Sequence, residues 1–400
     1  MTPDDLDYRP FDADNHYYEA LDAFTRHVPA EMQSRVVQWV EMDGRKYHLV
    51  GGTISHAVVN PTWDPVAMPG ALNAYFKGNP EGKSPLEMLK EREPLPAYYM
   101  DPAARVEVLD QQGLSGMWLF PTLGVLYEEL IKHDVEACAV MMQAFNQWLL
   151  DDWGYDYEGR IFGAPYLCLG DRDAAAAEVD KVVAAGAKVL VMRPAPVTTP
   201  LGTMSPFDSY FDPVWARINE SGVTLVVHAA DSGYSTHGYT RQDKFSAAGL
   251  TKTGGYNGPN LGAFSIERAA QDWFIQAVFE KIFDRFPRLR FASVENGSDF
   301  LAPMFRKFDQ TAKKSFGWFT DHPVDTFKEK VWMNPFWEDD VVEVAELMGA
   351  DHVIFGSDWP HIEGLPRPLD YLVELKEFDA ADVRKIMHDN AVALTTPLPA

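Results

Sequence analysis

The feature that most constrains the fold is an alternation of short apolar runs with amphipathic segments, which begins near Gly159 and continues to the C-terminus. Such an alternation is typical of parallel β-strands joined by crossover helices. Six strand-and-helix repeats can be followed in this part of the chain. Because helices cover parallel strands on the outside, the pattern predicts an α/β fold.

The strands expected in this half are short and apolar, and several of the helices stop at glycine or proline. The predicted strands cover 161–169, 188–192, 223–228, 288–294, 331–334 and 352–357. The predicted helices cover 173–185, 211–221, 265–286, 298–311, 339–348 and the stretch from 369 onward.

The N-terminal part supplies two more strands, over 11–16 and 115–121, and a helix over 127–150. Eight strand-and-helix pairs predict a single (β/α)₈ TIM barrel domain over residues 1–400, since barrels of about 250 residues grow by insertion. The largest insertion spans 30–104, after the first strand. It holds a predicted hairpin over 36–50 and a proline-rich segment, and we expect it to lie over the barrel mouth.

Ligand-type side chains stand at the ends of four predicted strands, where TIM barrels carry their active groups. The first strand ends in Asp14 and His16, the fifth in His228, the sixth in Glu295 and the eighth in Asp358. Residues two apart on a strand share a face, so the first pair can point into the barrel together. Each residue alone fits a capping or buried structural role, but the conjunction favours one shared site.

These carboxylates and imidazoles predict a divalent-metal site. Three carboxylates buried together would repel one another and lose hydration, and a cation removes both costs. Two imidazoles with three carboxylates suit iron(II), manganese(II) or zinc(II). One ion and two ions are both compatible with the set.

Two motifs resemble those of a known family. The run DNHYYE from Asp14 to Glu19 resembles the first-strand motif of the amidohydrolase superfamily. The run GSDWPHIEG from Gly356 to Gly364 resembles the eighth-strand motif of its amidohydrolase-related branch, which includes aminocarboxymuconate semialdehyde decarboxylase. Two positions differ, since Asp14 and Glu295 stand where many relatives carry histidine. The difference leaves open whether Glu295 binds the ion directly or hydrogen-bonds one of its ligands.

The resemblance implies a metal-dependent enzyme with defined residue roles. Asp358 is expected to act as general base and acid, and His361 to stabilise charge on a substrate oxygen. Arg193 is expected to bind a substrate carboxylate or carbonyl, or else to pair with a site carboxylate. Glu19 is expected to support His16 or to lie at a helix N-terminus.

Three functions fit these residues. The leading hypothesis is a hydrolase that uses a metal-activated water to cleave a thioester, ester or amide of a fairly large apolar carboxylic acid derivative. The large size expected of the substrate follows from the insertion and from aromatic residues expected to line a pocket. Tyr99 and Trp337 could equally serve only to pack the core. These aromatic residues are Trp63, Tyr98, Tyr99, Trp337 and Trp359.

The alternative is a metal-dependent, non-oxidative decarboxylase of an aromatic or unsaturated carboxylic acid, which the resemblance also allows. A binding or scaffold protein is the third interpretation, and a metal site without an open position would favour it. The presence of both Asp358 and His361 argues against that third interpretation.

Composition limits the partners. A net charge of -24 opposes nucleic-acid binding. No apolar run reaches the roughly 18 residues of a spanning helix, and the first ten residues are too acidic for a signal peptide. The two cysteines, Cys138 and Cys168, are too few for a disulfide framework and are expected to be buried. We expect a cytoplasmic enzyme acting on a small molecule, and a homodimer because that is common in the family resembled.

Overall fold

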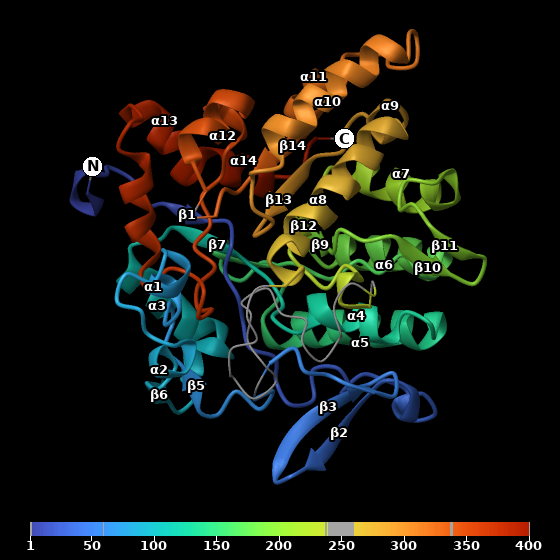
Figure 1. Cartoon of the computed structure of the whole chain (residues 1–400). Coiled ribbons are helices and arrows are strands. Elements are labelled where there is room, and N and C mark those ends of the chain that lie inside the picture. The colour runs from blue at the N-terminus through green and yellow to red at the C-terminus, as the bar shows by residue number, and fades with distance from the viewer. Residues whose placement is uncertain (1, 59, 237, 239–259, 337–338, 400) are drawn as a thin grey trace.

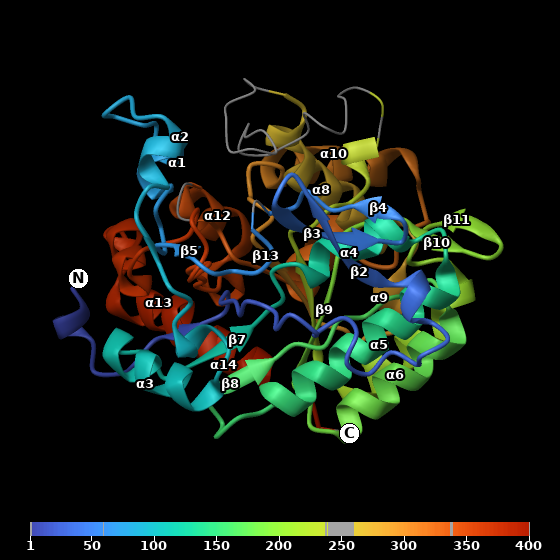
Figure 2. The same cartoon turned by 90° about the horizontal axis from the view of Figure 1, so that it is seen from below.

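The computed structural model describes residues 2–58, 60–236, 238, 260–336 and 339–399. Parallel strands lie at the centre, and helices surround them (Figure 1, Figure 2). The central strands form one sheet in the order β1-β7-β8 and another in the order β14-β13-β12-β9. Their bounds are Phe11–Asp12 (β1), Gly116–Leu119 (β7), Ile161–Gly163 (β8), Val189–Met192 (β9), Thr224–His228 (β12), Phe291–Val294 (β13) and Val331–Met333 (β14).

The two sheets meet at the edge between β8 and β9. Tyr166, just beyond β8, forms a parallel bridge with Val191 of β9. Leu167 N donates a hydrogen bond to the Val191 carbonyl (2.8 Å), and Val191 N donates to the Pro165 carbonyl (3.0 Å). The chain therefore passes from the first sheet to the second without a free strand edge at this point.

The opposite edges are joined by an extended segment, residues 353–358. On one side Ile354 N donates to the Met333 carbonyl of β14 (2.8 Å), and on the other Asp358 N donates to the Asp14 carbonyl (2.9 Å). As far as the structure describes the chain, seven strands and this segment close into a ring. The predicted (β/α)₈ barrel is confirmed.

The eighth strand is less regular than predicted. Residues Ala350–His352 form a 3₁₀ turn, so the strand expected over 352–357 does not begin as one. The segment that follows makes single bridges, from Val353 to Met333 on one side and from Trp359 to Asn15 on the other. The strand predicted over 161–169 is likewise regular only over β8, because the chain bends to reach β9.

The described helices lie outside the strands. The helices predicted over 173–185, 211–221, 298–311 and 339–348 begin and end within a turn of the observed ones, whereas the helices over 102–112 and 323–330 were not predicted. Among the described residues, no helix combines the length and the apolar character that crossing a membrane requires. Those outside the insertion are α3 (Pro102–Gln112), α4 (Gly124–Ile131), α5 (Val135–Asp152), α6 (Arg172–Ala184), α7 (Asp212–Ser221), α8 (Gly262–Phe279), α9 (Ile282–Arg285), α10 (Leu301–Lys314), α11 (Pro323–Lys330), α12 (Val341–Met348), α13 (Ala380–Arg384) and α14 (Asn390–Thr395).

Two helices predicted as continuous are interrupted. The helix over 127–150 is split into α4 and α5, because Asp134 starts a new helix by accepting a hydrogen bond from Ala137 N. The helix over 265–286 is split into α8 and α9 at Lys281, whose φ is +55°. The stretch from 369 onward is helical only in pieces, with a 3₁₀ segment over Pro368–Leu375 and a π segment over Lys385–Asp389 around α13 and α14.

A hairpin lies within the insertion where the sequence predicted one. Strands β2 (Val37–Met42) and β3 (Arg45–Val50) pair antiparallel and turn at Asp43 and Gly44. Both turn residues have positive φ, +52° and +72°, as a two-residue hairpin turn of this type requires. The hairpin extends away from the strands of the barrel (Figure 1).

Side chains of β3 attach the hairpin to α4. His48 Nδ1 lies 2.6 Å from the Tyr127 hydroxyl, and its ring packs against Trp39 with centroids 3.9 Å apart. Burial lowers the pKa of His48 to about 4, so this imidazole is neutral at neutral pH. The attachment therefore depends on packing and one neutral hydrogen bond.

The rest of the insertion reaches the loop that follows the eighth segment. It contains α1 (Asn73–Phe76) and α2 (Pro85–Met88) and the paired strands β5 (Val66–Ala67) and β6 (Arg92–Glu93). Gly70 N donates to the His361 carbonyl (2.9 Å), and Leu72 N donates to the Ile362 carbonyl (2.7 Å). The insertion is thus hydrogen-bonded to the loop that carries His361.

A buried carboxylate ties the eighth segment to β1. Asp12 is completely buried and accepts hydrogen bonds from Ser357 N (2.9 Å), Ser357 Oγ (2.6 Å) and Asn15 Nδ2 (2.8 Å). Burial raises the pKa of Asp12 to about 7, although the donors from Ser357 oppose the rise. Each of these contacts needs an acceptor at position 12.

We predict that Asp12→Asn lowers the free energy of unfolding by about 2 to 4 kcal/mol, because the new amide would face donors instead of accepting from them. Urea unfolding followed by circular dichroism measures the change. The matched control is Asp4→Asn, which alters an exposed carboxylate and should change stability by less than about 0.5 kcal/mol. Equal stability of Asp12→Asn and the parent protein would contradict this role.

Candidate metal centre

Two imidazoles face each other at the ends of strands on opposite parts of the barrel. His228 ends β12, and His16 follows β1 and forms a parallel bridge with Phe120. Their ring centroids are 5.1 Å apart. The prediction that these two residues lie close enough to share an ion is consistent with this separation.

Backbone carbonyls set the direction of both rings. His16 Nδ1 lies 3.3 Å from the Pro121 carbonyl oxygen, and His228 Nδ1 lies 2.8 Å from the Ala229 carbonyl oxygen. A carbonyl only accepts, so each Nδ1 carries a proton, and in the neutral ring each Nε2 has a free lone pair. Both lone pairs therefore belong to the nitrogens that face the centre of the site.

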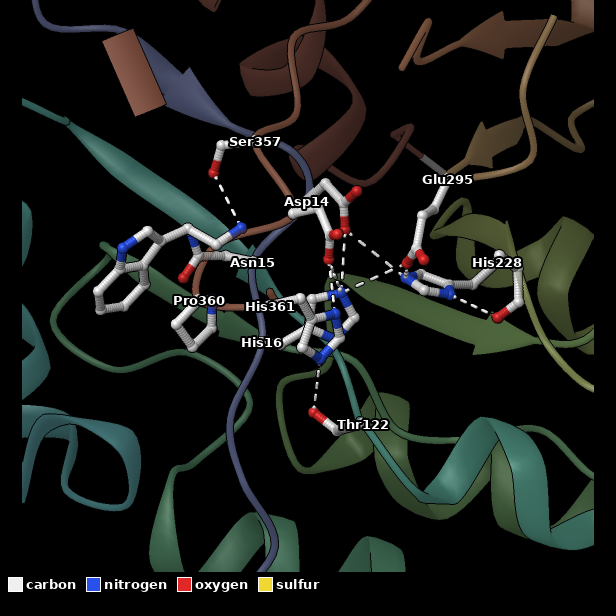
Figure 3. Close-up of polar contacts among 12 residues, drawn as sticks. Asp14, Asn15, His16, Thr122, His228, Glu295, Ser357, Pro360 and His361 are labelled. Carbon is white, nitrogen blue, oxygen red and sulfur yellow. Dashed lines mark hydrogen bonds and ion pairs between the residues drawn. The ribbon is translucent and has the colours of Figure 1, made fainter. Parts of the chain in front are cut away.

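Two carboxylates approach the same nitrogens. Asp14 Oδ1 lies 3.2 Å from His16 Nε2 and 3.6 Å from His228 Nε2. Glu295 Oε2 lies 3.2 Å from His228 Nε2 and 3.7 Å from His16 Nε2. Figure 3 shows both carboxylates pointing toward the two rings. The four ligand atoms lie within 4.8 Å of one another.

The chemistry of these atoms fits a divalent cation. Both Asp14 oxygens and the Nε2 atoms of His16 and His228 are buried and have no hydrogen-bond partner within the described part of the chain. Buried polar atoms without partners are rare and costly in native proteins. Atoms about 3 to 4 Å apart can share an ion with bonds of about 2 Å, so one cation would satisfy all of them.

Asp358 and His361 extend the site. Asp358 Oδ1 lies 3.4 Å from His16 Nε2 and 2.6 Å from His361 Nδ1. The His361 ring stacks on the His16 ring, with centroids 3.9 Å apart. Ligand atoms of these three residues and Glu295 form a second group within 4.8 Å. The geometry is therefore compatible with one ion or with two.

The protonation of His361 follows from Thr122. The Thr122 hydroxyl donates to the Tyr17 carbonyl (2.7 Å) and lies 3.0 Å from His361 Nε2. Since its proton is already used, Thr122 accepts from His361 Nε2, which must carry a proton. A neutral His361 then presents a lone pair on Nδ1 to Asp358 at 2.6 Å. Two acceptors this close need a proton or a cation between them.

The buried charges shift the pKa values of the site. Burial lowers the pKa of His16, but the neighbouring carboxylates of Asp14 and Glu295 outweigh this effect and raise it to about 9. Burial raises the pKa of Asp358 well above its ordinary value, and the charge on Glu295 adds to the rise. Burial and the same charge raise the pKa of Glu363 to about 7. The site therefore holds excess negative charge that attracts cations and protons.

Backbone strain is concentrated at two of the site residues. Glu295 has a φ of +58° and Asp358 a φ of +55°, in the left-handed region that residues with a Cβ rarely occupy. Such strain costs of order 1 kcal/mol or more and persists where the surroundings hold the residue in place. At the ends of the sixth and eighth strands it turns both carboxylates toward the two imidazoles.

Arg105 supports the backbone of the site and was not predicted from the sequence. Its guanidinium is fully buried and donates to Asn15 Oδ1 (2.5 Å), the His16 carbonyl (2.6 Å) and the Tyr98 carbonyl (2.6 Å). It also lies over the Trp359 ring, 4.6 Å from the centroid. Asp12, Thr122 and Arg105 all act through contacts between segments distant in sequence, so local patterns carry no signal for them.

Arg193 does not join the metal residues. Its NH1 donates to Glu129 Oε2 (2.6 Å) and to the Asp231 carbonyl (2.7 Å), and its Nε lies 3.3 Å from Glu128 Oε2. Neither predicted role describes these contacts, because the paired carboxylates belong to α4 and not to the metal site. The buried guanidinium is committed to α4 and to the segment after β12.

Glu19 occupies a helix N-terminus, which was one of its two predicted positions. Its Oε1 accepts from Leu123 N (2.6 Å) and Gly124 N (3.1 Å) at the start of α4. Burial raises its pKa to about 7, and the backbone donors only partly oppose this.

Four of the five predicted pocket aromatics cluster beside the site. Trp63 stacks on Tyr18 with centroids 4.3 Å apart, and Tyr98 and Tyr99 lie 5.8 and 5.7 Å from the Trp359 ring. Trp337 lies outside the described residues.

Comparison with known families decides the affiliation of the chain. The sequence model of the amidohydrolase family matches residues 101–394. This chain belongs to the amidohydrolase family. The match confirms the predicted family and covers the eighth-strand motif, whereas the first-strand motif at residues 14–19 lies outside the matched residues. It agrees with a metal-dependent barrel enzyme. Curated proteins give no match.

Solved structures resemble this amidohydrolase over most of its length. An amidohydrolase from Mycobacterium avium subsp. paratuberculosis K-10 is 38% identical, with a TM-score of 0.91 and coverage of 98% of this chain and 100% of that chain. Two decarboxylases show the same fold at lower identity. A dihydroxybenzoic acid decarboxylase from Polaromonas sp. JS666 with bound manganese is 17% identical (TM-score 0.59, coverage 81% and 93%). The 5-carboxyvanillate decarboxylase from Sphingomonas paucimobilis is 15% identical (TM-score 0.57, coverage 97% and 98%).

We predict that His228→Ala weakens divalent-metal binding by the amidohydrolase more than about 100-fold, since even loss of a group behind a ligand costs up to that much. Elemental analysis after dialysis against a weak chelator measures the retained metal. His133→Ala removes an exposed imidazole outside the metal residues and should retain as much metal as the parent protein. Full retention by His228→Ala would exclude it as a ligand.

Metal binding should also release protons. Because the pKa of His16 in the ion-free protein is about 9, this ring is protonated at neutral pH and must lose its proton to bind an ion. The affinity should therefore rise with pH and level off above about pH 9. Calorimetric titration in buffers of different ionisation enthalpy counts the protons. An uptake of protons, or an affinity that does not depend on pH in this range, would contradict the assignment.

Proposed function

We propose that this amidohydrolase hydrolyses an acyl bond, with Asp358 as general base and acid. The observation that carries the proposal is the contact of 2.6 Å between Asp358 Oδ1 and His361 Nδ1, beside the nitrogen of His16 that faces the site. A carboxylate there can take a proton from an attacking water and later give it to the leaving group. Hydrolysis requires both transfers, and one buried group can perform them.

A bound divalent cation would supply a water of lowered pKa, near 7, and polarise the substrate carbonyl. Asp14, His16, His228 and Glu295 would hold it, and Asp358 lies at the edge of that group. Thr122 fixes the His361 ring by accepting from Nε2, so the ring keeps its Nδ1 toward Asp358. His361 would then be placed to stabilise negative charge that develops on the substrate oxygen.

Aromatic side chains support an apolar acyl substrate. Trp63 stacks on Tyr18, which lies over His361. Tyr98 lies beside Trp359, and Tyr99 contacts both Tyr18 and Trp359. Together with the insertion, they favour a thioester, ester or amide of a fairly large apolar carboxylic acid as the substrate. Iron, manganese and zinc all suit the ligand set, and a cytoplasmic homodimer remains our expectation.

Decarboxylation of an aromatic or unsaturated acid is the second candidate. It is favoured by the solved structures of similar fold that are named as decarboxylases of aromatic acids. In that reaction the proton held between Asp358 and His361 would go to the carbon that loses carbon dioxide. The two reactions thus use the same residues but differ in whether water enters the product.

We predict that Asp358→Asn lowers kcat by about 10²-fold to 10⁴-fold, because the amide cannot accept the proton. The variant should retain its divalent metal, since the other four ligand-type residues are unchanged. Asp180→Asn, on the outer helix α6, is the matched control and should keep full activity. Full activity of Asp358→Asn would exclude the proposed role.

Isotope incorporation separates the two reactions. A panel of naphthoyl thioesters, esters and amides and of hydroxybenzoic acids is incubated with the manganese-loaded enzyme in ¹⁸O water. We expect label in the carboxylic acid product of an acyl substrate. Release of carbon dioxide from a hydroxybenzoic acid, with no turnover of acyl substrates, would replace hydrolysis by decarboxylation.

A further inference from the structure

A cavity whose lining contains none of the metal residues lies between the tip of the hairpin and the β5–β6 part of the insertion. Its volume is about 810 Å³. Residues of the hairpin turn form one wall, and residues around β5 and β6 form the other. Glu19 and Met100 also line it, so the cavity reaches the segment that directly follows the first metal motif.

Three cations line this cavity. Arg45 and Lys46 come from the start of β3, and Arg92 comes from β6. All three side chains are exposed, and none has an ion-pair partner among the residues that the structure describes. In a chain with a net charge of -24, three cations gathered without partners are unusual.

Two carboxylates on the same walls do not cancel these charges. Glu19 is buried and accepts from the first amides of α4, and its pKa is raised to about 7 by burial. Asp64 is exposed at the rim. The described lining therefore keeps an excess of positive charge, which attracts an anionic group.

Trp63 provides an independent sign of a ligand. It lines the cavity, is 7% exposed, and its buried Nε1 donor has no hydrogen-bond partner in the described part of the chain. Its φ is +60°, which a bulky residue adopts only at a cost. The strained backbone and the unpaired donor of Trp63, at the wall of this cavity, support a ligand-binding role for the residue.

Ring contacts join the cavity to the metal centre. The Trp63 ring stacks on Tyr18 at 4.3 Å, and Tyr18 lies over His361 at 6.2 Å. His361 in turn stacks on His16 at 3.9 Å. The rings thus form a stack from the cavity wall to the metal centre, and a substrate with its reactive group at the metal centre would run beside this stack to place its far end in the cavity.

We propose that this cavity binds an anionic group, a carboxylate or a phosphate, at the end of the substrate remote from the reacting bond. The inference deepens the proposed function and rests on it for the position of the reacting bond. Arg45, Lys46 and Arg92 supply the charge, and Trp63 supplies an apolar surface and a donor. The substrate class is thus an apolar acyl compound that carries a second, negatively charged end.

The test uses binding and not turnover, so it does not depend on the reaction. Three fluorescent probes that share a naphthalene ring, 2-naphthyl phosphate, 2-naphthoate and neutral 2-naphthol, are titrated into the manganese-loaded enzyme and followed by fluorescence anisotropy at low salt. The variants are the double substitution Arg45→Gln with Lys46→Gln and the single substitution Arg92→Gln. Lys90→Gln is the matched control, because Lys90 is exposed and close in sequence to Arg92 but does not line the cavity.

The anionic probes should bind the parent protein more tightly than 2-naphthol. Removal of one cation should raise their Kd by about threefold to fivefold, and the double variant by about tenfold, with little change for 2-naphthol. Lys90→Gln should bind the probes as the parent protein does. Because binding is measured without turnover, failure of this proposal is distinguishable from failure of the catalytic one. The tighter of the two anionic probes identifies phosphate or carboxylate as the bound group.

Two results would overturn the proposal. Anion affinity that is unchanged in the cavity variants would place the anion elsewhere, for example on the metal ion. Equal binding of 2-naphthol and the anionic probes would show that charge is not recognised. Circular dichroism of each variant verifies folding, and all three substituted cations are exposed, so loss of the fold is not expected.

Discussion

The main constraint on the structure of this amidohydrolase is the electrostatic repulsion among several carboxylates that are buried together. Asp14, Glu295 and Asp358 approach the same two imidazoles, and Asp14 and Asp358 are completely buried. Without a cation, such a cluster would be held only by the folding energy of the whole barrel. The surrounding structure keeps the groups together in spite of their repulsion, so that an ion finds its ligands already arranged.

Most of the contacts that position these carboxylates lie where the eighth segment meets β1 and closes the barrel. The eighth segment is too irregular for a long strand, but it carries Asp358 in a left-handed backbone conformation that a regular strand could not provide. The segment forms few strand-pairing hydrogen bonds, and Asp12 compensates by accepting hydrogen bonds from the backbone and side chain of Ser357. Arg105 performs a similar task for the backbone around His16. Irregular strand pairing, local backbone strain and buried polar contacts therefore act together to hold the site residues in position.

The barrel and the convergence of the candidate metal ligands could be predicted from the sequence, because both follow from local signals. Apolar runs mark buried strands, and a ligand-type residue at a strand end marks the active face. The contacts of Arg193 were not predictable, since the carboxylates that bind it come from α4, in another part of the chain. The break between α4 and α5 was missed because the apolar period continues through it, although Asp134 was a visible capping signal. Thr122 carried no signal, since its role depends on a ring more than two hundred residues away.

The backbone bonds from Gly70 and Leu72 to the loop of His361 bear on how enzymes of this kind diversify. A cover that only encloses a substrate can be exchanged between homologues without disturbing the chemistry beneath it. Here backbone hydrogen bonds hold the inserted region and the loop of His361 together. A change in the insertion that accommodates a new substrate would therefore also shift the loop of His361, so that substrate selectivity and the reaction would change together.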